Sequence, residues 1–167
     1  MSSSDTLPAA ALVYAASGGV DDLLAAFARD LQARGLRVRG LLQRPDPGGT
    51  VLLDLATGER YPLFQDLGRG SGACSVDSAS VAAASITLRR ALGEDADLVL
   101  VNRYGPLEAA GGGFAAEMLA LMSEGVPLLT AVAERNLAEW RHFTGGTAAE
   151  LPPRPEAIAA WFAGLGR

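Results

Sequence analysis

The sequence predicts an α/β protein of three layers, with a mostly parallel sheet between helices and an inserted antiparallel hairpin. Short apolar runs of strand length alternate along the chain with segments of helical periodicity. Most of these runs are continuous, as in strands that are buried on both faces. A chain of 167 residues with 49% hydrophobic residues can bury a full core. We expect a disordered start over residues 1–8 and a single domain over residues 9–167.

A strand, a glycine loop and a helix open the chain. The apolar residues 10–16 run into Ser-Gly-Gly at positions 17–19. A helix is expected over residues 21–34, because acidic residues occupy its first turn and Gly35 follows it. This order is typical of the first unit of a Rossmann-like or P-loop-like sheet.

The next segment predicts a second strand and a hairpin. Residues 37–44 are expected to form the strand, and the sequence PDPGG breaks the pattern before residues 50–55. Residues 56–59 supply a turn and residues 61–65 return, so an antiparallel ribbon is expected beside the parallel strands. A loop rich in Gly and Ser follows over residues 67–78.

The central strand is expected at residues 98–101, between two helices. The first helix covers residues 79–92 and has Asp77 or Ser78 as its N-cap. The strand gives way to Asn102 and Arg103, and a long loop with three successive glycines then leads to the second helix.

The last part of the chain predicts one more strand and two helices. The strand is expected over residues 126–132. Asn136 and Glu139 resemble a capping box at the start of a short helix, and Pro155 suits the first turn of the final helix. The final helix has an apolar stripe for the core, formed by Ile158, Trp161, Phe162 and Leu165.

The carboxyl ends of parallel strands meet at one edge of a sheet, where ligands of such folds bind. Four segments are expected to arrive there, namely residues 17–19, 43–44, 102–103 and 134–135. The edge is therefore the predicted binding site.

The glycine loop at this edge has two interpretations. Ser17, Gly18 and Gly19 can form a phosphate cradle, since a helix follows whose first amides favour an anion. A P-loop reads GxxxxGK[ST], however, and Val20 and Asp21 stand here in place of the lysine and the hydroxyl residue. The loop is alternatively a tight turn in which Asp21 caps the helix.

Arg103 and Asn102 also have alternative roles. Arg103 can donate two hydrogen bonds to a phosphate or to a tetrahedral oxyanion such as molybdate, or it can pair with Glu108 as a structural clamp. Asn102 can contact the ligand or hold the glycine loop through its side-chain amide.

A second candidate anion site precedes the helix at residues 79–92. It comprises Ser71, Gly72, Cys74, Ser75 and Asp77. Cys74 would be a stabilised thiolate at a helix start, or an inert buried residue, and Asp77 would be a ligand or an N-cap.

A third segment has aromatic residues that suit either a lid over a ligand or simple packing. These are Trp140 and Phe143, which flank the single histidine, His142. His142 has no visible nucleophile or carboxylate partner in the sequence, so no catalytic dyad is predicted.

Composition excludes several classes of partner. The net charge of -5 and the pI of about 4.8 argue against binding to nucleic acid or to an anionic membrane surface. No apolar run approaches the length of a membrane span, and the first residues lack a signal peptide's basic start, so we expect a cytoplasmic protein. One cysteine and one histidine allow neither an internal disulfide nor a zinc site of Cys and His, and no metal is expected.

The order of these features resembles the small thermophile-type nucleoside-triphosphatase family of P-loop NTPases. The segments VRGLLQ, DLATGERYPL, ADLVLVNRYGPLEAAGGGF and GVPLLTAV occur in the family's order. The family's central strand ends in Asp-Glu-x-Gly-x-x-Glu, whose acids serve magnesium and water. Asn102 and Arg103 replace the first two acids and Glu108 matches the third. The resemblance implies a P-loop NTPase-like fold with degenerate Walker motifs.

Three segments are also similar to an uncharacterised bacterial family often met beside molybdate-uptake genes. They are VNRYGPLEAAGGGF, QDLGRGSGACSVDS and EWRHFTGG. The altered strand end and a Cys-x-x-Asp segment, here Cys74 and Asp77, are shared with that family. This resemblance implies an oxyanion-related or molybdenum-related role.

The sequence thus predicts a non-hydrolysing P-loop-like protein that binds a small anion, either molybdate, tungstate or a nucleotide. One alternative is a nucleoside-triphosphate hydrolase in which Glu108 positions water and Arg103 stabilises charge. Another is a non-enzymatic partner in molybdenum uptake or cofactor assembly. A protein partner and a homo-oligomer both remain open.

Overall fold

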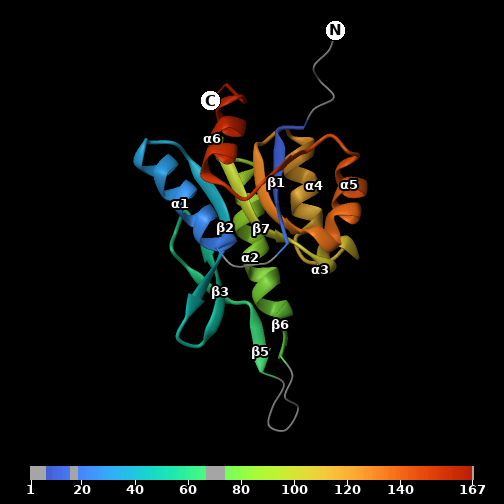
Figure 1. Cartoon of the computed structure of the whole chain (residues 1–167). Coiled ribbons are helices and arrows are strands. Elements are labelled where there is room, and N and C mark those ends of the chain that lie inside the picture. Colours follow the sequence, from blue (N-terminus) through green and yellow to red (C-terminus); the bar gives the residue numbers. More distant parts are fainter. Residues whose placement is uncertain (1–6, 16–18, 67–73, 167) are drawn as a thin grey trace.

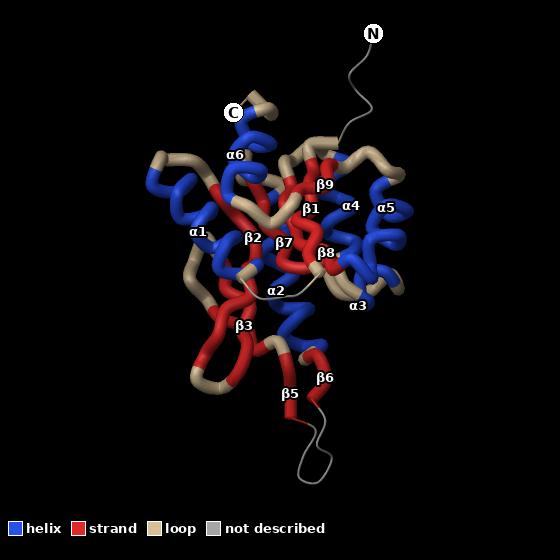
Figure 2. The backbone as a smooth tube through the Cα atoms, in the orientation of Figure 1, coloured by secondary structure: helices blue, strands red, loops and turns tan. Residues whose placement is uncertain are grey.

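The structure is a computed structural model, and it describes residues 7–15, 19–66 and 74–166. Seven strands of this part of the chain form one sheet, in the order β4-β3-β2-β7-β8-β1-β9 (Figures 1 and 2). Their bounds are β1 (Ala9–Tyr14), β2 (Val38–Asp46), β3 (Gly49–Asp54), β4 (Arg60–Pro62), β7 (Leu98–Tyr104), β8 (Leu128–Ala133) and β9 (Ala149–Leu151). Strands β2, β7, β8, β1 and β9 run parallel, whereas β3 and β4 are antiparallel additions beyond β2. This is the predicted α/β architecture, which is consistent with a P-loop NTPase-like fold.

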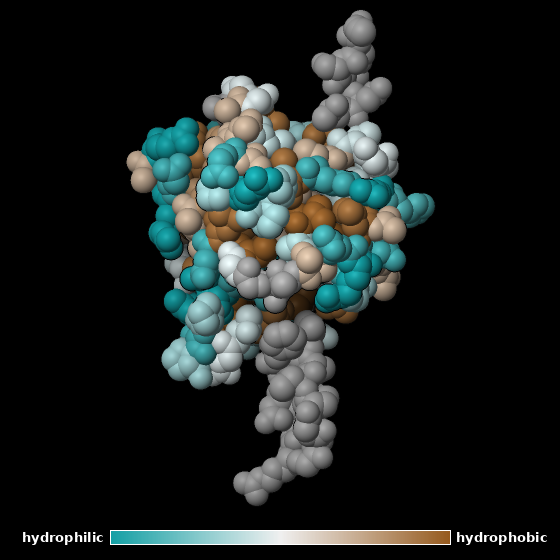
Figure 3. Space-filling view, viewed as in Figure 1, coloured by the Kyte–Doolittle hydropathy of each residue, from teal (hydrophilic) through white to brown (hydrophobic). Residues whose placement is uncertain are grey.

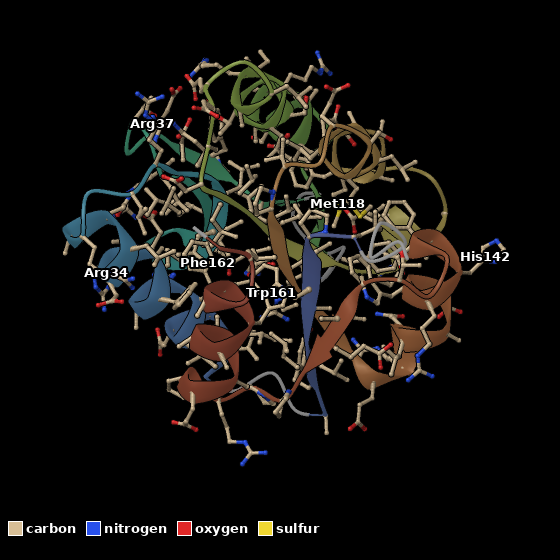
Figure 4. All side chains as sticks on the ribbon, turned by 90° about the horizontal axis from the view of Figure 1, so that it is seen from above. Arg34, Arg37, Met118, His142, Trp161 and Phe162 are labelled. Carbon is tan, nitrogen blue, oxygen red and sulfur yellow. The ribbon has the colours of Figure 1, made fainter. Side chains whose placement is uncertain are left out.

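Helices cover both faces of the sheet, so the protein has three layers (Figure 4). Helices α1 (Val20–Ala33) and α6 (Pro155–Ala163) pack on one face. The other face carries α2 (Ser78–Ala91), α4 (Ala115–Ser123) and α5 (Leu137–Thr144). Met118 lies between α4 and the sheet, whereas His142 points away from the protein.

The side chains of β7 point alternately into the two hydrophobic cores, one on each face of the sheet, which explains the continuous apolar run of this strand. Leu98 and Leu100 face α1 and α6, while Val99 and Val101 face α2 and α4. Successive side chains of a strand point to opposite faces, so a strand buried on both sides needs an apolar residue at every position. The space-filling view shows hydrophobic residues in the middle of one face and hydrophilic residues around its rim (Figure 3).

A glycine permits the close approach of β2 to this central strand. Gly40 has φ of 116°, and a Cβ there would lie 2.0 Å from the carbonyl oxygen of Leu100. Any side chain at position 40 would therefore push the two strands apart.

Several expected boundaries are corrected. Strand β2 continues through the expected break to Asp46 and turns directly into β3, and β7 continues through Arg103 to Tyr104. Part of the expected loop before α2 is strand β6 (Cys74–Val76), which pairs with β5 (Phe64–Asp66) as a separate ribbon below the sheet in Figure 1. Short strand β9 was not predicted. Within the described residues, no helix has the length and apolar character needed to cross a membrane.

Candidate functional site

The carboxyl ends of β1, β2, β7 and β8 lie together at the lower edge of the sheet in Figure 1. Helix α1 begins at this edge, after Gly19, which takes the left-handed conformation with φ of 86°. Ser17 and Gly18 lie outside the described residues, so only Gly19 of the predicted phosphate cradle is described and the cradle stays a prediction. The described part of the site is built from β1, α1, β2, β7 and the loop after β7.

Asp21, in the first turn of α1, holds the end of β7. Its Oδ1 accepts a hydrogen bond from Asn102 Nδ2 at 2.8 Å. Its Oδ2 accepts one from the Arg103 guanidinium at 3.0 Å. A second guanidinium nitrogen of Arg103 donates to the hydroxyl of Tyr14 at 2.9 Å, and the guanidinium lies 5.3 Å from the centre of the Tyr14 ring. These contacts tie β1, α1 and β7 together.

The charges of this network cancel, but two of its polar atoms stay unpaired. The Arg103 and Asp21 side chains are 23% and 28% exposed, so water screens their ion pair only in part. Asn102 is only 2% exposed. Neither Asn102 Oδ1 nor Arg103 Nε has a hydrogen-bond partner among the described residues. Because unpaired buried polar atoms are rare and costly, this pair marks the strand end as a candidate contact for a ligand.

The donor set does not fit the magnesium ion of a P-loop NTPase. In those proteins the P-loop hydroxyl and an acid at a strand end hold the ion. Asp21 and Asn102 stand at the corresponding positions here, but the Asn102 amide donates directly to the Asp21 carboxylate. The guanidinium of Arg103 lies 3.0 Å from the other carboxylate oxygen, where a second cation would be repelled.

Glu108 is buried in the short helix α3 (Pro106–Ala109), and it organises the segment after β7. Its two carboxylate oxygens accept hydrogen bonds from the backbone N–H groups of Gly105 and Phe114, at 2.9 and 3.0 Å. A Cβ at Gly113 would lie 2.0 Å from Oε2, so the loop fits closely around this carboxylate. Burial raises the pKa of Glu108, and the two N–H donors offset part of that rise. The alternative in which Glu108 pairs with Arg103 as a structural clamp is wrong, since Arg103 pairs with Asp21.

A cavity of about 350 Å³ opens beside these residues. Most of its wall is apolar and comes from β3, the residue after β4, α2 and the segment after β7 that includes α3. Its polar lining residues are Gln43, Asn102, Arg103 and Glu108. Sequence reasoning missed this cavity, because Leu52, Leu63 and Val81 have the pattern of ordinary core residues. The one available signal was Gln43, a polar residue at a predicted strand end.

The second candidate anion site is only partly described. Ser71 and Gly72 lie outside the described residues. Cys74 and Ser75 belong to β6, but the structure does not describe their side chains, so their role stays a prediction. Asp77 is confirmed as the N-cap of α2, since its Oδ1 accepts a hydrogen bond from the backbone N–H of Ser80 at 3.1 Å.

The aromatic residues of α5 pack this helix against the sheet. Trp140 is fully buried, and its ring centre lies 5.2 Å from that of Tyr104. Phe143 contacts both rings, whereas His142 is exposed. The packing alternative is therefore confirmed for Trp140. Asn136 is the N-cap of α5, but its side chain makes no capping hydrogen bond, so the expected capping box is wrong.

The chain is similar to a described protein family and to a named relative. A family model described as "Protein of unknown function (DUF2478)" matches residues 9–161. The protein named "Molybdenum import ATP-binding protein ModC 2" from Bradyrhizobium diazoefficiens is 37% identical over 159 residues. This match covers 92% of the chain but only 18% of that relative, so most of the relative's length has no counterpart here.

Proposed function

We propose a function from one premise: the chain belongs to the family described as protein of unknown function DUF2478. The proposed function is that of a P-loop NTPase-like binding protein with a molybdenum-related role. It binds a small anion at the strand ends and does not hydrolyse nucleoside triphosphates by the magnesium-dependent route. The name of the relative supports the connection with molybdenum.

The observation that carries the proposal is the pairing of Asp21 with Asn102 and Arg103. Phosphoryl transfer in P-loop NTPases depends on a lysine and a magnesium ion to neutralise the developing charge. Val20 stands in place of that lysine, and an internal ion pair stands where the magnesium ligands would be. Both supports of hydrolysis are therefore replaced.

Arg103 supports the binding of an anion at the same edge. Hydrogen bonds to Tyr14 and Asp21 hold its guanidinium at this edge. Its buried Nε–H has no partner among the described residues, so it can donate a charge-assisted hydrogen bond to an oxyanion or a phosphate once the side chain turns toward the ligand. Molybdate, tungstate and nucleotide phosphates all present suitable oxygens.

The test is isothermal titration of the whole chain with molybdate, tungstate, ATP and GTP, together with an assay of phosphate release in the presence of magnesium. We expect saturable binding of at least one anion, a loss of that binding of at least tenfold in Arg103→Gln, and no phosphate release above buffer. Arg154→Gln is the control, since Arg154 is exposed and lies at the start of α6, whereas Arg103 lies in β7. The proposal is overturned if none of the four binds, or if magnesium-dependent phosphate release falls in Glu108→Gln.

A second candidate function is favoured by the length of the relative. Since the chain corresponds to 18% of a protein named for ATP binding in molybdenum import, it is also suited to act as a partner module of such an import protein. The chain would then bind the partner without any chemistry of its own. Co-purification from cells grown with and without molybdate tests this function, and a lone monomer under both conditions counts against it.

A further inference from the structure

We propose that the cavity of about 350 Å³ beside Arg103 binds a planar heterocyclic base, as the free base or as part of a nucleoside or nucleotide. This inference takes from the proposed function only the location of the site at the strand ends. It adds a class of ligand and a set of apolar contacts that the recognition of an anion does not use.

The size and walls of the cavity suit the faces of an aromatic ring. Pockets for small ligands occupy roughly 300–1,000 Å³ and are mostly apolar. The apolar side chains of this cavity come from three places along the chain, namely the hairpin, α2 and the loop after β7: Leu52, Leu63, Val81, Pro106, Leu107 and Phe114. A bare oxyanion gains nothing from such walls, because its oxygens need hydrogen-bond donors. A flat heterocycle buries its apolar faces against such walls.

The polar atoms of the cavity residues suit the edge of such a ring. Asn102 Oδ1 is an unpaired acceptor and Arg103 Nε is an unpaired donor, and both belong to residues that line the cavity. A heterocyclic base carries N–H donors beside carbonyl or ring-nitrogen acceptors, so one edge can serve both atoms. Both atoms are buried, so a ligand reaches them through rotation of the Asn102 or Arg103 side chain. Gln43 supplies an amide from β2 on the same lining.

The charges of the site also favour a neutral ring. The guanidinium of Arg103 is balanced by Asp21, and both oxygens of Glu108 accept backbone N–H groups. A purely aliphatic ligand would leave Asn102 Oδ1 and Arg103 Nε without partners, and a bare anion would leave the apolar wall without contacts. The heterocycle is the class that uses both features.

The experiment titrates the whole chain with adenine, hypoxanthine, adenosine, ATP, tripolyphosphate and molybdate. Val81→Phe fills the cavity, and Gln43→Ala removes an amide without filling it. The matched control is Leu119→Phe, because Leu119 is 46% exposed on α4 and does not line the cavity. Circular dichroism and thermal unfolding verify that each variant is folded.

We expect saturable binding of at least one base-containing probe. Val81→Phe should weaken this binding at least tenfold and Gln43→Ala about threefold, with no change in Leu119→Phe. Binding by adenine or adenosine identifies the ring alone as sufficient, whereas binding by ATP that is lost in Val81→Phe identifies a nucleotide.

Two results overturn the inference. In the first, no base-containing probe binds. In the second, ATP and tripolyphosphate bind equally and Val81→Phe changes neither, so that phosphate alone is recognised. Molybdate or tripolyphosphate binding in either case leaves the proposed function standing, and the two failures are thus distinguishable.

Discussion

Removal of the Asp21 carboxylate should lower stability and raise anion affinity at the same time. In Asp21→Ala, the Asn102 amide loses its acceptor at 2.8 Å, and Asn102 is only 2% exposed. A buried donor left without a partner costs about 1–3 kcal/mol. The Arg103 guanidinium also loses its counter-ion, but it keeps its hydrogen bond to the Tyr14 hydroxyl and its partial contact with water, so this loss is the smaller contribution. We expect a loss of about 2 kcal/mol in the free energy of unfolding.

Asp22→Ala is the matched control for this prediction. Asp22 is the next residue of α1, and its side chain is 80% exposed where it pairs with Arg44. Exposed ion pairs contribute about 0–1 kcal/mol, so this variant should change stability by less than about 0.5 kcal/mol.

Urea denaturation, monitored by tryptophan fluorescence, measures both variants, since Trp140 is fully buried. For a domain of this size, 2 kcal/mol corresponds to a fall in Tm of about 4–8 °C. Anion titration of Asp21→Ala should show tighter binding than the unaltered chain, because the guanidinium of Arg103 has lost its internal counter-ion. The reasoning is refuted if Asp21→Ala and Asp22→Ala are equally stable, or if Asp21→Ala binds anions more weakly.

Two further predictions concern buried features away from the site. Burial raises the pKa of Asp54, but hydrogen bonds from the Thr87 hydroxyl at 2.6 Å and from backbone N–H groups outweigh it, so the pKa is lowered on balance. The carboxylate therefore stabilises the fold above its unfolded pKa of about 3.9, and this contribution is lost as the pH falls through the lower folded value. Thr87→Val should make the fall in stability between about pH 5 and pH 3 shallower in denaturation curves, and an unchanged slope would contradict this reasoning. Gly40→Ala should lower the free energy of unfolding by about 3 kcal/mol or more, because the added Cβ would overlap the Leu100 carbonyl at a φ of 116°. The measurement is the Tm of the variant. A fall in Tm of less than about 2 °C would contradict this reasoning, since it would show that β2 and β7 separate easily.

The layers of the fold were predictable because their signal is local. The continuous run of Leu98 to Val101 marks a strand buried on both faces, and the structure places its alternate side chains in the two cores. Strand β9 was missed because Ala149–Leu151 is too short to show a period. Strand β6 was missed because it is short and adjoins a sequence rich in glycine and serine, which is typical of a loop.

The position of Arg103 was predictable from the sequence, but its contacts were not. The rule for parallel strands placed Arg103 at the carboxyl edge of the sheet, where the structure has it, whereas its partner had to be chosen between carboxylates far apart in sequence. Glu108 is five residues away from Arg103, yet its oxygens are used by the loop that it closes. Asp21 is 82 positions away and makes the ion pair. Periodicity and turn signals depend on residues that are close in the sequence, so they do not show which of the two carboxylates pairs with Arg103.

If an anion binds at Arg103 as proposed, Asp21 competes with it for the guanidinium. An anion would bind the guanidinium in place of the Asp21 carboxylate, so the hydrogen bond from Arg103 to Asp21 would have to break. The same carboxylate also accepts a hydrogen bond from Asn102. Displacing Asp21 would therefore release the Asn102 amide as well, at the wall of the cavity. If both proposed ligands bind, we predict that anion binding and the binding of a ring in the cavity are coupled through these three side chains. By linkage, each ligand should change the affinity for the other by the same factor, and Asp21→Ala should reduce that factor toward one.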